Sequence, residues 1–419
     1  MELPGFYKLP LKERIAKIKE IAGLSEEEVG VLMNSGSLSL EIADRMVENV
    51  IGVGHLPIGV ATHFKINGKE VLVPMEIEEP SVIAAASNAA KLCLPEGFTA
   101  KADEPVMIGQ VQFMRVRNAE ESVRMIEKEK REIIAAASGF AKQIEKYGGG
   151  VRDVYAKAFK TERGEMVVVY FDIDVRDAMG ANTINTILEG VSPTLAGYID
   201  GEYKLRILSN LAVKRKAYAK AVWKKDVIGE NAVEGVLDAY EFARADIFRT
   251  ATHNKGIMNG VDAVALATGQ DWRAIEAGAH AYASLNGYKP LTHYEKNENG
   301  DLAGRIELPL AVGTVGGAIN TSPTAKLCLK ILNVKSAKEL AMVMACVGLA
   351  NNFAALRALS TEGIQKGHMK LHARNLAIIA GAKTPEEIDA VANALSEKKE
   401  YSVEAAKKII EKMRGMHKS

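Results

Sequence analysis

Apolar and polar positions follow two different periods along the chain, and these separate helical stretches from strands. Residues 12–50 place apolar side chains at helical spacing, and Ser25 followed by Glu28 forms a capping box at the start of one helix. His63 to Val73 instead alternates around an Asn-Gly turn signal, and Pro80 then opens the helical segment EEPSVIAAASNAAKL. The first hundred residues therefore predict helices with a small sheet.

The next hundred residues predict a second unit with a different pattern. Two long helical stretches, Glu120 to Tyr147 and Ala178 to Ile199, separate its strand candidates. The strands are expected at Val106–Phe113, Val154–Phe159, Met166–Val175 and Lys204–Leu208. This order, β-α-β-β-α-β, is the split arrangement of ferredoxin-like folds. Because the unit begins and ends in mid-chain, we expect an insertion into a larger domain.

The remainder of the chain is Ala-rich and predicts mostly helix, interrupted by a Gly-rich loop at Gly313–Gly317. The fold class is therefore α+β, with a mostly helical large domain, a small sheet, an inserted ferredoxin-like domain and a helical C-terminal segment. The expected boundaries are residues 1–103 and 212–361 for the two parts of the large domain, 104–211 for the insertion and 362–419 for the C-terminal segment.

Composition narrows the class of protein. Of 419 residues, 47% are apolar and 26% are charged, which is typical of a folded globular protein. Fifty-four basic against 53 acidic residues give a net charge of +1, so no global field favours nucleic acid or an anionic membrane. The N-terminal sequence lacks the apolar core of a signal peptide, and the apolar run Leu340–Ala350 is too short to span a bilayer. We expect a cytoplasmic protein without nucleic-acid or membrane partners.

Three cysteines, Cys93, Cys328 and Cys346, lie far apart in apolar sequence. They lack the paired spacing of a zinc site or a redox dithiol, so we predict buried, reduced thiols. Such thiols agree with a reducing cytoplasm.

One polar segment, ATHNKGIMNGVDAVALATGQD, is embedded in apolar sequence. Glycines and Asn259 flank Lys255, which predicts a loop where backbone can approach a ligand closely. Asp271 ends the segment. The plainer interpretation is a surface lysine in a turn and an aspartate that caps the helix beginning at Trp272; spacing alone favours this second interpretation.

Glu79 precedes Pro80, so its carboxylate is expected at the start of the Ser81 to Leu92 helix. An acid that stabilises the helix N-terminus is the plainer interpretation. A proton donor near neutral pH would need burial and a neighbouring carboxylate, for which Asp271 is a candidate.

Two histidines, His368 and His372, are four residues apart in GHMKLH. A zinc-protease pattern needs glutamate after the first histidine, but Met369 occupies that position and no third ligand motif follows. We therefore predict no metal site. A single acid-base histidine following the Gly367 hinge agrees better with the pattern.

The segment VRDAMGAN, Val175 to Asn182, lies where the third strand of the insertion ends and a helix begins. Small residues there leave backbone N–H groups able to face a phosphate. The chain contains neither GxGxxG nor GxxxxGK[ST], and GTVGGA at Gly313 fits neither. A nucleotide site would therefore be of neither the Rossmann nor the P-loop type.

Together these segments resemble one family, the class II form of 3-hydroxy-3-methylglutaryl-coenzyme A (HMG-CoA) reductase. The motifs, in family order, are ENVIG (Glu48–Gly52), EEPSVIAAAS (Glu78–Ser87), DAMGANTINT (Asp177–Thr186), HNKGIMNG (His253–Gly260), ATGQDWRAIEAGAHAYA (Ala267–Ala283), GTVGGA (Gly313–Ala318) and LSTEGIQKGHMKLHARN (Leu359–Asn375). The resemblance runs from Pro4 almost to the C-terminus. It implies a two-step, four-electron reduction of (S)-HMG-CoA to mevalonate and coenzyme A with two NAD(P)H, in the mevalonate pathway of isoprenoid biosynthesis.

The resemblance implies four catalytic residues, Glu79, Lys255, Asp271 and His368. Lys255 would stabilise the thioester oxygen as it becomes anionic on hydride transfer. His368 would protonate the coenzyme A thiolate, and Glu79 would protonate the oxygen that becomes the alcohol. Asp271 would link Glu79 and Lys255, so that the carboxylate pair keeps a proton on Glu79. His372 is assigned no catalytic role.

The resemblance also implies binding residues and an assembly. The substrate carboxylate would be bound by Ser81, Arg249 and Asn259. The inserted domain would bind the cofactor through Asp177, Ala178, Met179, Gly180, Ala181 and Asn182. The family is dimeric, with ENVIG at the interface and active sites shared by two chains, and higher assembly is open. The C-terminal segment is expected to act as a flap that carries His368 over the site.

Cofactor choice depends on residues near the ribose. An acidic side chain there accepts from the 2′-hydroxyl of NADH, whereas a 2′-phosphate favours Lys or Arg. Before Gly148–Gly150 the sequence has Lys142, where a user of NADH would be expected to show an acid; Lys146 and Arg152 are nearby, and Glu145 and Asp153 reduce the basic excess. We slightly favour NADPH over NADH.

Two alternatives remain. The same catalyst can work oxidatively in mevalonate catabolism with identical residues. A coenzyme A or nucleotide binding module without catalysis would lack at least one of the four catalytic residues, and all four are present.

Overall fold

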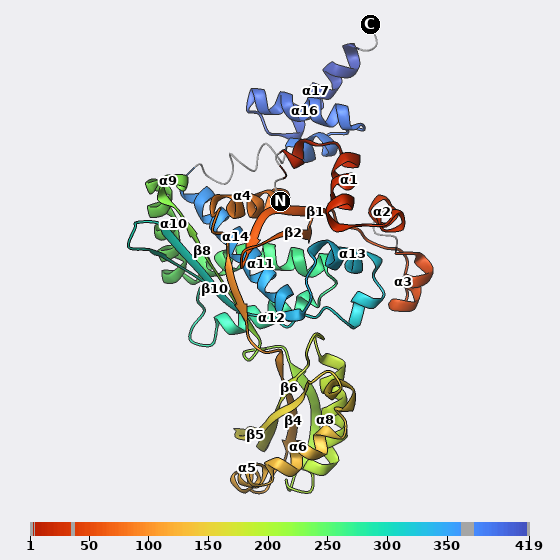
Figure 1. Cartoon of the computed structure of the whole chain (residues 1–419), viewed down its shortest axis with the longest axis vertical. Coiled ribbons are helices and arrows are strands. Elements are labelled where there is room, and N and C mark those ends of the chain that lie inside the picture. The colour runs from red at the N-terminus through yellow and green to blue at the C-terminus, as the bar shows by residue number, and fades with distance from the viewer. Residues whose placement is uncertain (1–2, 4, 35–37, 362–372, 417–419) are drawn as a thin grey trace.

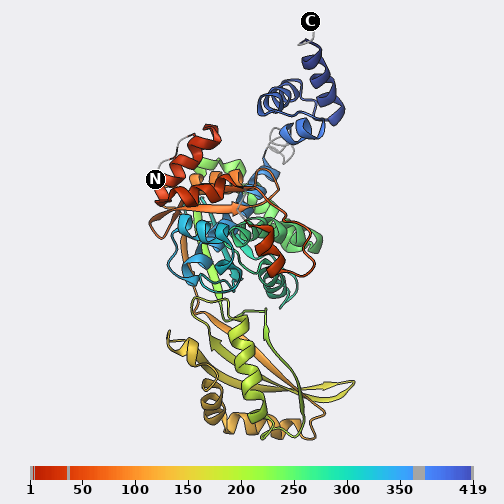
Figure 2. The same cartoon turned by 90° about the vertical axis from the view of Figure 1, so that its right-hand side faces the viewer.

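The computed structural model describes residues 3, 5–34, 38–361 and 373–416. Three units follow one another along its longest axis (Figures 1 and 2). The inserted domain is at one end, the large domain is in the middle and the C-terminal helices are at the other end. Both helices and small sheets contribute, which confirms the α+β class.

The N-terminal part of the large domain contains the predicted helices and hairpin. Its helices are η1 (Phe6–Lys8), α1 (Leu11–Ala22), α2 (Glu26–Met33) and α3 (Leu40–Met46). Ser25 and Glu28 form the expected capping box of α2. Strands β1 (Ile58–Ile66) and β2 (Lys69–Glu76) are antiparallel, and Asn67 and Gly68 join them at positive φ.

A central sheet and two long helices form the main core. The sheet order is β3 (Thr99–Ala102), β8 (Lys216–Trp223), β10 (Leu302–Pro309) and β9 (Thr292–Lys296), all antiparallel. Helix α14 (Ala337–Ser360) packs on this sheet, and α11 (Ile247–Ala267) packs on α14. The sequence pattern predicts the helices of this region but misses its three strands, β8, β9 and β10.

The remaining helices of the large domain surround this core. They are α4 (Val82–Leu92), α9 (Lys225–Ile228), α10 (Glu230–Ala245), α12 (Trp272–Ala283), η2 (Gly317–Asn320) and α13 (Pro323–Leu332). Helix α14 is long and apolar enough to span a membrane, but 78% of its most apolar 18-residue window is buried inside the protein. It is therefore a core helix. Cys93, Cys328 and Cys346 are buried, free thiols, as predicted.

The inserted domain has the predicted order of elements. Strands β4 (Val106–Met114), β5 (Gly150–Thr161), β6 (Gly164–Asp174) and β7 (Glu202–Ser209) form an antiparallel sheet in the order β5-β6-β4-β7. Its helices are α5 (Ala119–Lys128), α6 (Lys130–Ser138), α7 (Lys142–Glu145) and α8 (Ala181–Leu195). The first expected helix is thus broken into three. The domain has its own apolar core, and the expected boundaries at residues 104 and 211 lie within its two connections to the central sheet.

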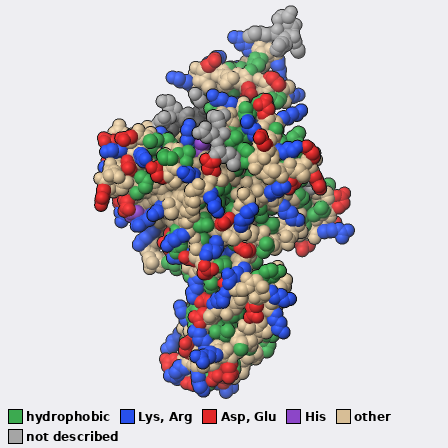
Figure 3. Space-filling model, viewed as in Figure 1, with side chains coloured by type: hydrophobic (Ala, Val, Ile, Leu, Met, Phe, Trp, Pro, Cys, Tyr) green, Lys and Arg blue, Asp and Glu red, His purple; other side chains and the backbone are tan. Residues whose placement is uncertain are grey.

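The C-terminal unit contains α16 (Pro385–Lys398) and α17 (Val403–Met416), which pack around a separate apolar cluster. Figure 2 shows this unit beyond the large domain, away from α1. Its role as a flap stays a prediction. Over the visible face of the protein, basic and acidic side chains are mixed (Figure 3), in agreement with the near-zero net charge.

Candidate active site

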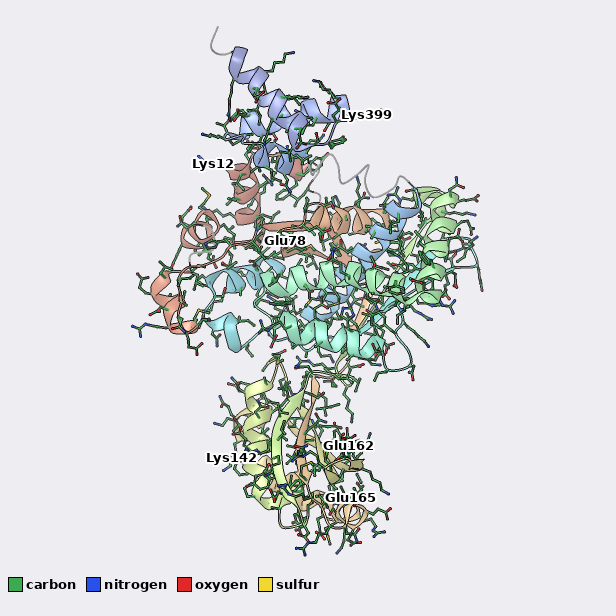
Figure 4. All side chains as sticks on the ribbon, turned by 180° about the vertical axis from the view of Figure 1, so that it is seen from behind. Lys12, Glu78, Lys142, Glu162, Glu165 and Lys399 are labelled. Atoms are coloured by element: carbon green, nitrogen blue, oxygen red, sulfur yellow. The ribbon has the colours of Figure 1, made fainter. Side chains whose placement is uncertain are left out.

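Glu79 lies in the short connection between β2 and α4, which Glu78 marks in Figure 4. Helix α4 begins at Val82, so Pro80 precedes the helix and is not its first residue as predicted. Ser81 is the N-cap residue, and its φ of 81° is a left-handed conformation that is uncommon for a residue other than glycine. Such backbone strain is concentrated at functional sites.

Two side chains of α11 converge on the carboxylate of Glu79. The Lys255 ammonium donates to Glu79 Oε2 at 3.0 Å, and the Asn259 amide donates to the same oxygen at 3.4 Å. Lys255 and Asn259 are four residues apart, so they share one face of the helix. The side chains of Lys255 and Glu79 are 62% and 35% exposed, which leaves the pair open to a substrate.

The loop predicted around Lys255 is wrong, because this segment is the middle of the 21-residue helix α11. Its glycine at 260 has a packing reason instead. A Cβ there would lie 2.5 Å from Asn351 Nδ2, so glycine lets α11 approach α14 closely. The exposed face of α11 thereby presents Lys255 and Asn259 from a rigid element.

Arg249 lies in the first turn of α11, on the N-terminal side of Lys255. Partial burial lowers the pKa of Arg249, and its guanidinium forms no salt bridge with a residue that the structure describes. A half-buried cation without a protein carboxylate is suited to bind a carboxylate of a ligand.

Asp271 caps α12 and accepts a hydrogen bond from the Ala274 N–H at 3.1 Å. This is the capping role that the plainer interpretation predicts. Twelve residues of α11 separate Lys255 from Ala267, which corresponds to about 18 Å along the helix axis. Among the described residues Asp271 pairs with Arg273 at 3.5 Å, and no hydrogen bond or ion pair joins it to Glu79 or Lys255.

Asp271 instead directly follows Gln270, whose side-chain amide clamps the Gly-rich loop through two hydrogen bonds. The Gln270 amide donates to the Gly313 carbonyl at 2.9 Å and accepts from the Gly313 N–H at 2.8 Å. A Cβ at position 313 would lie 2.8 Å from the backbone nitrogen of Met179, so glycine allows contact with the turn formed by residues 177–182, the DAMGAN turn. The Thr314 N–H donates to the Asp177 carbonyl at 2.8 Å. The clamp thus joins the Asp271 region to the turn expected to bind the cofactor.

The DAMGAN turn connects the end of β6 to the start of α8, as predicted. Gly180 is the N-cap at φ 107°, and α8 begins at Ala181. Asp177 Oδ1 accepts from the Ala337 N–H at 2.8 Å, so this aspartate also anchors the turn to α14. The N–H groups of Gly180, Ala181 and Asn182 have no acceptor among the described residues. These donors fit a phosphate.

Two arginines surround the neighbouring glycine loop. Arg152 Nη2 donates to the Gly148 carbonyl at 2.7 Å and to Asp174 Oδ2 at 2.9 Å. Arg176 also donates to Gly148 and has a positive φ of 52°. Lys142, which is on α7, lies in the same domain (Figure 4). Both arginines form ion pairs with the one carboxylate of Asp174, so the pair keeps a net positive charge that fits an anionic part of a nucleotide.

Arg176 and Gln270 also belong to the site, although the sequence pattern gives neither residue a role of its own. The sequence feature that could have indicated them is their position, because each directly precedes a predicted site residue, Asp177 or Asp271. His368 and His372 lie outside the described residues.

Burial lowers the pKa of His253 to about 3, so the histidine of HNKGIMNG is neutral near pH 7.

Comparisons with known proteins agree on one family. The sequence model of hydroxymethylglutaryl-coenzyme A reductase matches residues 10–373. A 3-hydroxy-3-methylglutaryl-coenzyme A reductase from Archaeoglobus fulgidus is 53% identical over 414 residues, covering 98% of this chain and 94% of that protein. A probable enzyme of the same name from Borreliella burgdorferi is 35% identical over 379 residues, covering 88% of this chain and 86% of that protein.

Solved structures from Streptococcus pneumoniae are similar throughout. A 3-hydroxy-3-methylglutaryl-coenzyme A reductase superposes with a TM-score of 0.84 at 39% identity, covering 99% of this chain and all of that one. A class II enzyme bound to NADPH in open conformations gives a TM-score of 0.83 at 40% identity, covering 86% of this chain and all of that one. With the Glu79–Lys255 pair and the DAMGAN turn in place, these matches show that the chain belongs to the hydroxymethylglutaryl-coenzyme A reductase family, a family of oxidoreductases.

Proposed function

We propose that this protein reduces HMG-CoA to mevalonate and coenzyme A and uses NADPH as the hydride donor. The observation that carries the proposal is the convergence of Lys255 and Asn259 on one oxygen of Glu79. An ammonium and a carboxyl group 3.0 Å apart can act together on one carbonyl oxygen, the first by stabilising negative charge and the second by donating a proton.

Each residue then has a distinct task. When bound, NADPH would supply hydride to the carbonyl carbon. Lys255 stabilises the oxygen as it becomes anionic, in both reductive steps. Glu79 gives the proton that completes the alcohol. Asn259, which the resemblance assigns to the substrate carboxylate, donates instead to Glu79 in this structure, so we give it the role of holding the Glu79 carboxyl toward Lys255. Arg249 binds the substrate carboxylate, and Ser81, whose backbone is held in a strained conformation, donates a hydrogen bond beside it.

His368 is proposed to protonate the departing coenzyme A thiolate. Its replacement by Gln should slow the reaction of the thioester and largely spare the reduction of free mevaldehyde, because the aldehyde releases no thiolate. Equal losses on both substrates would show that this role is wrong.

The active site is proposed to form between two copies of the chain. About 18 Å of α11 separates Lys255 from Ala267, and no hydrogen bond or ion pair between described residues joins Asp271 to Glu79 or Lys255, which supports a site completed by a second chain. One chain would supply Glu79 and Lys255, and its partner would supply Asp271 with the adjoining DAMGAN turn. Ile51 of the ENVIG segment is fully exposed, and Phe248 at the start of α11 is 82% exposed. An interface with a second chain would remove this apolar surface from water.

NADPH is favoured by the basic cluster near the glycine loop. Arg152 and Arg176 both approach Gly148, and no acidic residue occupies position 142. A relative with 40% identity is named as bound to NADPH. Initial rates with each cofactor at equal concentration test the preference, and a higher kcat/KM with NADH would reverse it.

We also propose a cytoplasmic location and the reductive direction. The reduction is tested by its stoichiometry, because reduction of the thioester to the alcohol consumes two NADPH for each coenzyme A released. A ratio of one would mean that the reaction stops at the aldehyde and would contradict the proposal. Efficient oxidation of mevalonate with a poor forward rate would favour the catabolic alternative, which uses the same residues.

A further inference from the structure

Arg215 is a buried cation at the junction between two domains. It lies in the connection between β7 and β8, where the chain returns from the inserted domain to the central sheet, and the residue is only 5% exposed. Its Nη1 donates to the carbonyls of Ala178 at 3.0 Å and Met179 at 3.2 Å, and its Nη2 donates to the carbonyl of Val312. One side chain thus holds three carbonyls from two domains.

The charge of Arg215 is not neutralised by an ion pair with any residue that the structure describes. Burial lowers the pKa of Arg215 to about 10, so the guanidinium remains charged near pH 7. The carboxylates of Asp177 and Asp174 favour this charge from a longer distance. A buried cation that binds only carbonyls costs stability through desolvation, so its presence calls for a role in addition to packing.

The orientation of the peptide groups indicates that role. In a trans peptide the N–H points opposite to the C=O of the same unit. Because the Met179 carbonyl points at Arg215, the Gly180 N–H points away from it. That N–H is one of the donors without an acceptor at the start of α8. A guanidinium charge on the carbonyl side adds to the attraction that these donors exert on an anion.

The contact with Val312 extends the same anchor to the large domain. Val312 directly precedes Gly313, whose backbone is clamped in both directions by Gln270. Gln270 in turn precedes Asp271. Arg215 therefore fixes the DAMGAN turn and the loop next to Asp271 relative to one another.

We propose that Arg215 is a positioning residue for the nicotinamide cofactor: it holds the Ala178 and Met179 carbonyls so that the N–H groups of the DAMGAN turn face the cofactor diphosphate. This inference rests on the proposed function. Arg215 does not touch the reacting atoms, and it affects the reaction through the turn.

The test uses the full-length protein and measures NADP⁺ binding by titration calorimetry alongside the KM for each substrate. R215M removes the charge, and we expect the Kd for NADP⁺ and the KM for NADPH to rise at least about tenfold, with the KM for HMG-CoA changed less than about twofold. R215K keeps the charge but lacks the planar fork, so its loss should be intermediate. R206M is the matched control, because Arg206 lies on β7 and contacts the Tyr203 ring instead of the turn.

G313A provides a second route that leaves Arg215 intact. The added Cβ would lie 2.8 Å from the Met179 nitrogen and 3.0 Å from the Asp177 carbonyl, so it should displace the turn and weaken NADP⁺ binding as R215M does. It also carries the test, together with R215K, if R215M does not fold. NADP⁺ binding equal to wild type in the folded Arg215 variants would overturn the inference, and so would equal rises in the KM for NADPH and for HMG-CoA. Failure of the wild-type protein to bind NADP⁺ would instead contradict the proposed function.

Discussion

Lys255 is a single residue whose loss should separate activity from stability. Its side chain is 62% exposed and its one described ion pair is with Glu79, so Lys255→Ala should change the free energy of unfolding by less than about 0.5 kcal/mol. Turnover should fall about 10³-fold or more, because the ammonium stabilises charge that develops only in the transition state. NADPH absorbance and thermal melting measure the two effects. A rate close to wild type would remove Lys255 from the mechanism.

A second residue-scale prediction concerns a carboxyl pair beside the site. The Asp262 carboxyl on α11 is close enough to Glu276 of α12 to be affected by its charge, and Glu276 also accepts from His280 at 2.9 Å. Burial and the Glu276 charge raise the pKa of Asp262 to about 9, whereas His280 lowers that of Glu276. Asp262 thus holds its proton in the folded protein near pH 7.

The pH dependence of stability follows from this difference. Unfolded Asp262 loses its proton near pH 4 while the folded protein keeps it up to about pH 9, so stability should fall as pH rises across that interval. The lowered pKa of Glu276 acts only below this interval. Asp262→Asn should raise the melting temperature at pH 8.5 more than at pH 5.5, and Asp238→Asn, at an exposed position of α10, is the control. An equal shift at both pH values would contradict the assignment.

Long motifs in the sequence indicate the functional residues within them, whereas residues that act through the backbone leave no such pattern. Glu79, Lys255 and Asn259 lie in such motifs, and Lys255 and Asn259 both contact Glu79. Arg215 was not singled out, because a lone arginine before a strand has no pattern that reveals which carbonyls it binds. The same limit explains Asp271, because no sequence pattern reveals whether its predicted contact with Glu79 forms within one chain or, as proposed, between two.

At the scale of elements, periodicity predicted the inserted domain better than the central sheet. Strand β8, KAYAKAVW, places Ala217, Ala219 and Ala221 toward the core, and these residues are favoured in helices. Tertiary packing overrides this propensity, because small side chains are needed where the sheet lies under α14. In the inserted domain, β4 and β6 are rich in β-branched and aromatic residues, and their pattern was clear.

The N-terminal cap of helix α11 is expected to contribute measurably to stability. Asp246 caps this helix by accepting from the Arg249 N–H at 2.8 Å. Asp246→Ala should cost about 1 kcal/mol in the free energy of unfolding, measured by urea denaturation, and Asp246→Asn should retain most of the stability because asparagine is an equally good cap. Equal losses in the two variants would show that the cap contributes little.

At the scale of the whole molecule, a site shared by two chains predicts recovery of activity on mixing. Lys255→Ala and Asp271→Ala should each be inactive. After random reassociation half of the dimers contain both chains, and one of their two sites is then intact, so activity should reach about a quarter of wild type. Assays of co-refolded mixtures measure this recovery.

The matched control pairs Lys255→Ala with Glu79→Gln. Because these two residues come from the same chain, each site of the mixed dimer carries one of the two substitutions and activity should stay absent. Recovery in the control, or its absence in the first mixture, would contradict the shared site.

The three buried thiols all belong to the large domain. Cys93 follows α4, Cys328 lies on α13 and Cys346 lies on α14, while residues 104–211 and 373–416 contain no cysteine. Burial raises the pKa of Cys93 and Cys328 to about 12, so little reactive thiolate exists in the folded protein. The natural sequence therefore carries a built-in reporter: an alkylating reagent records only openings of the large domain, and the inserted domain can unfold and refold without leaving a chemical trace.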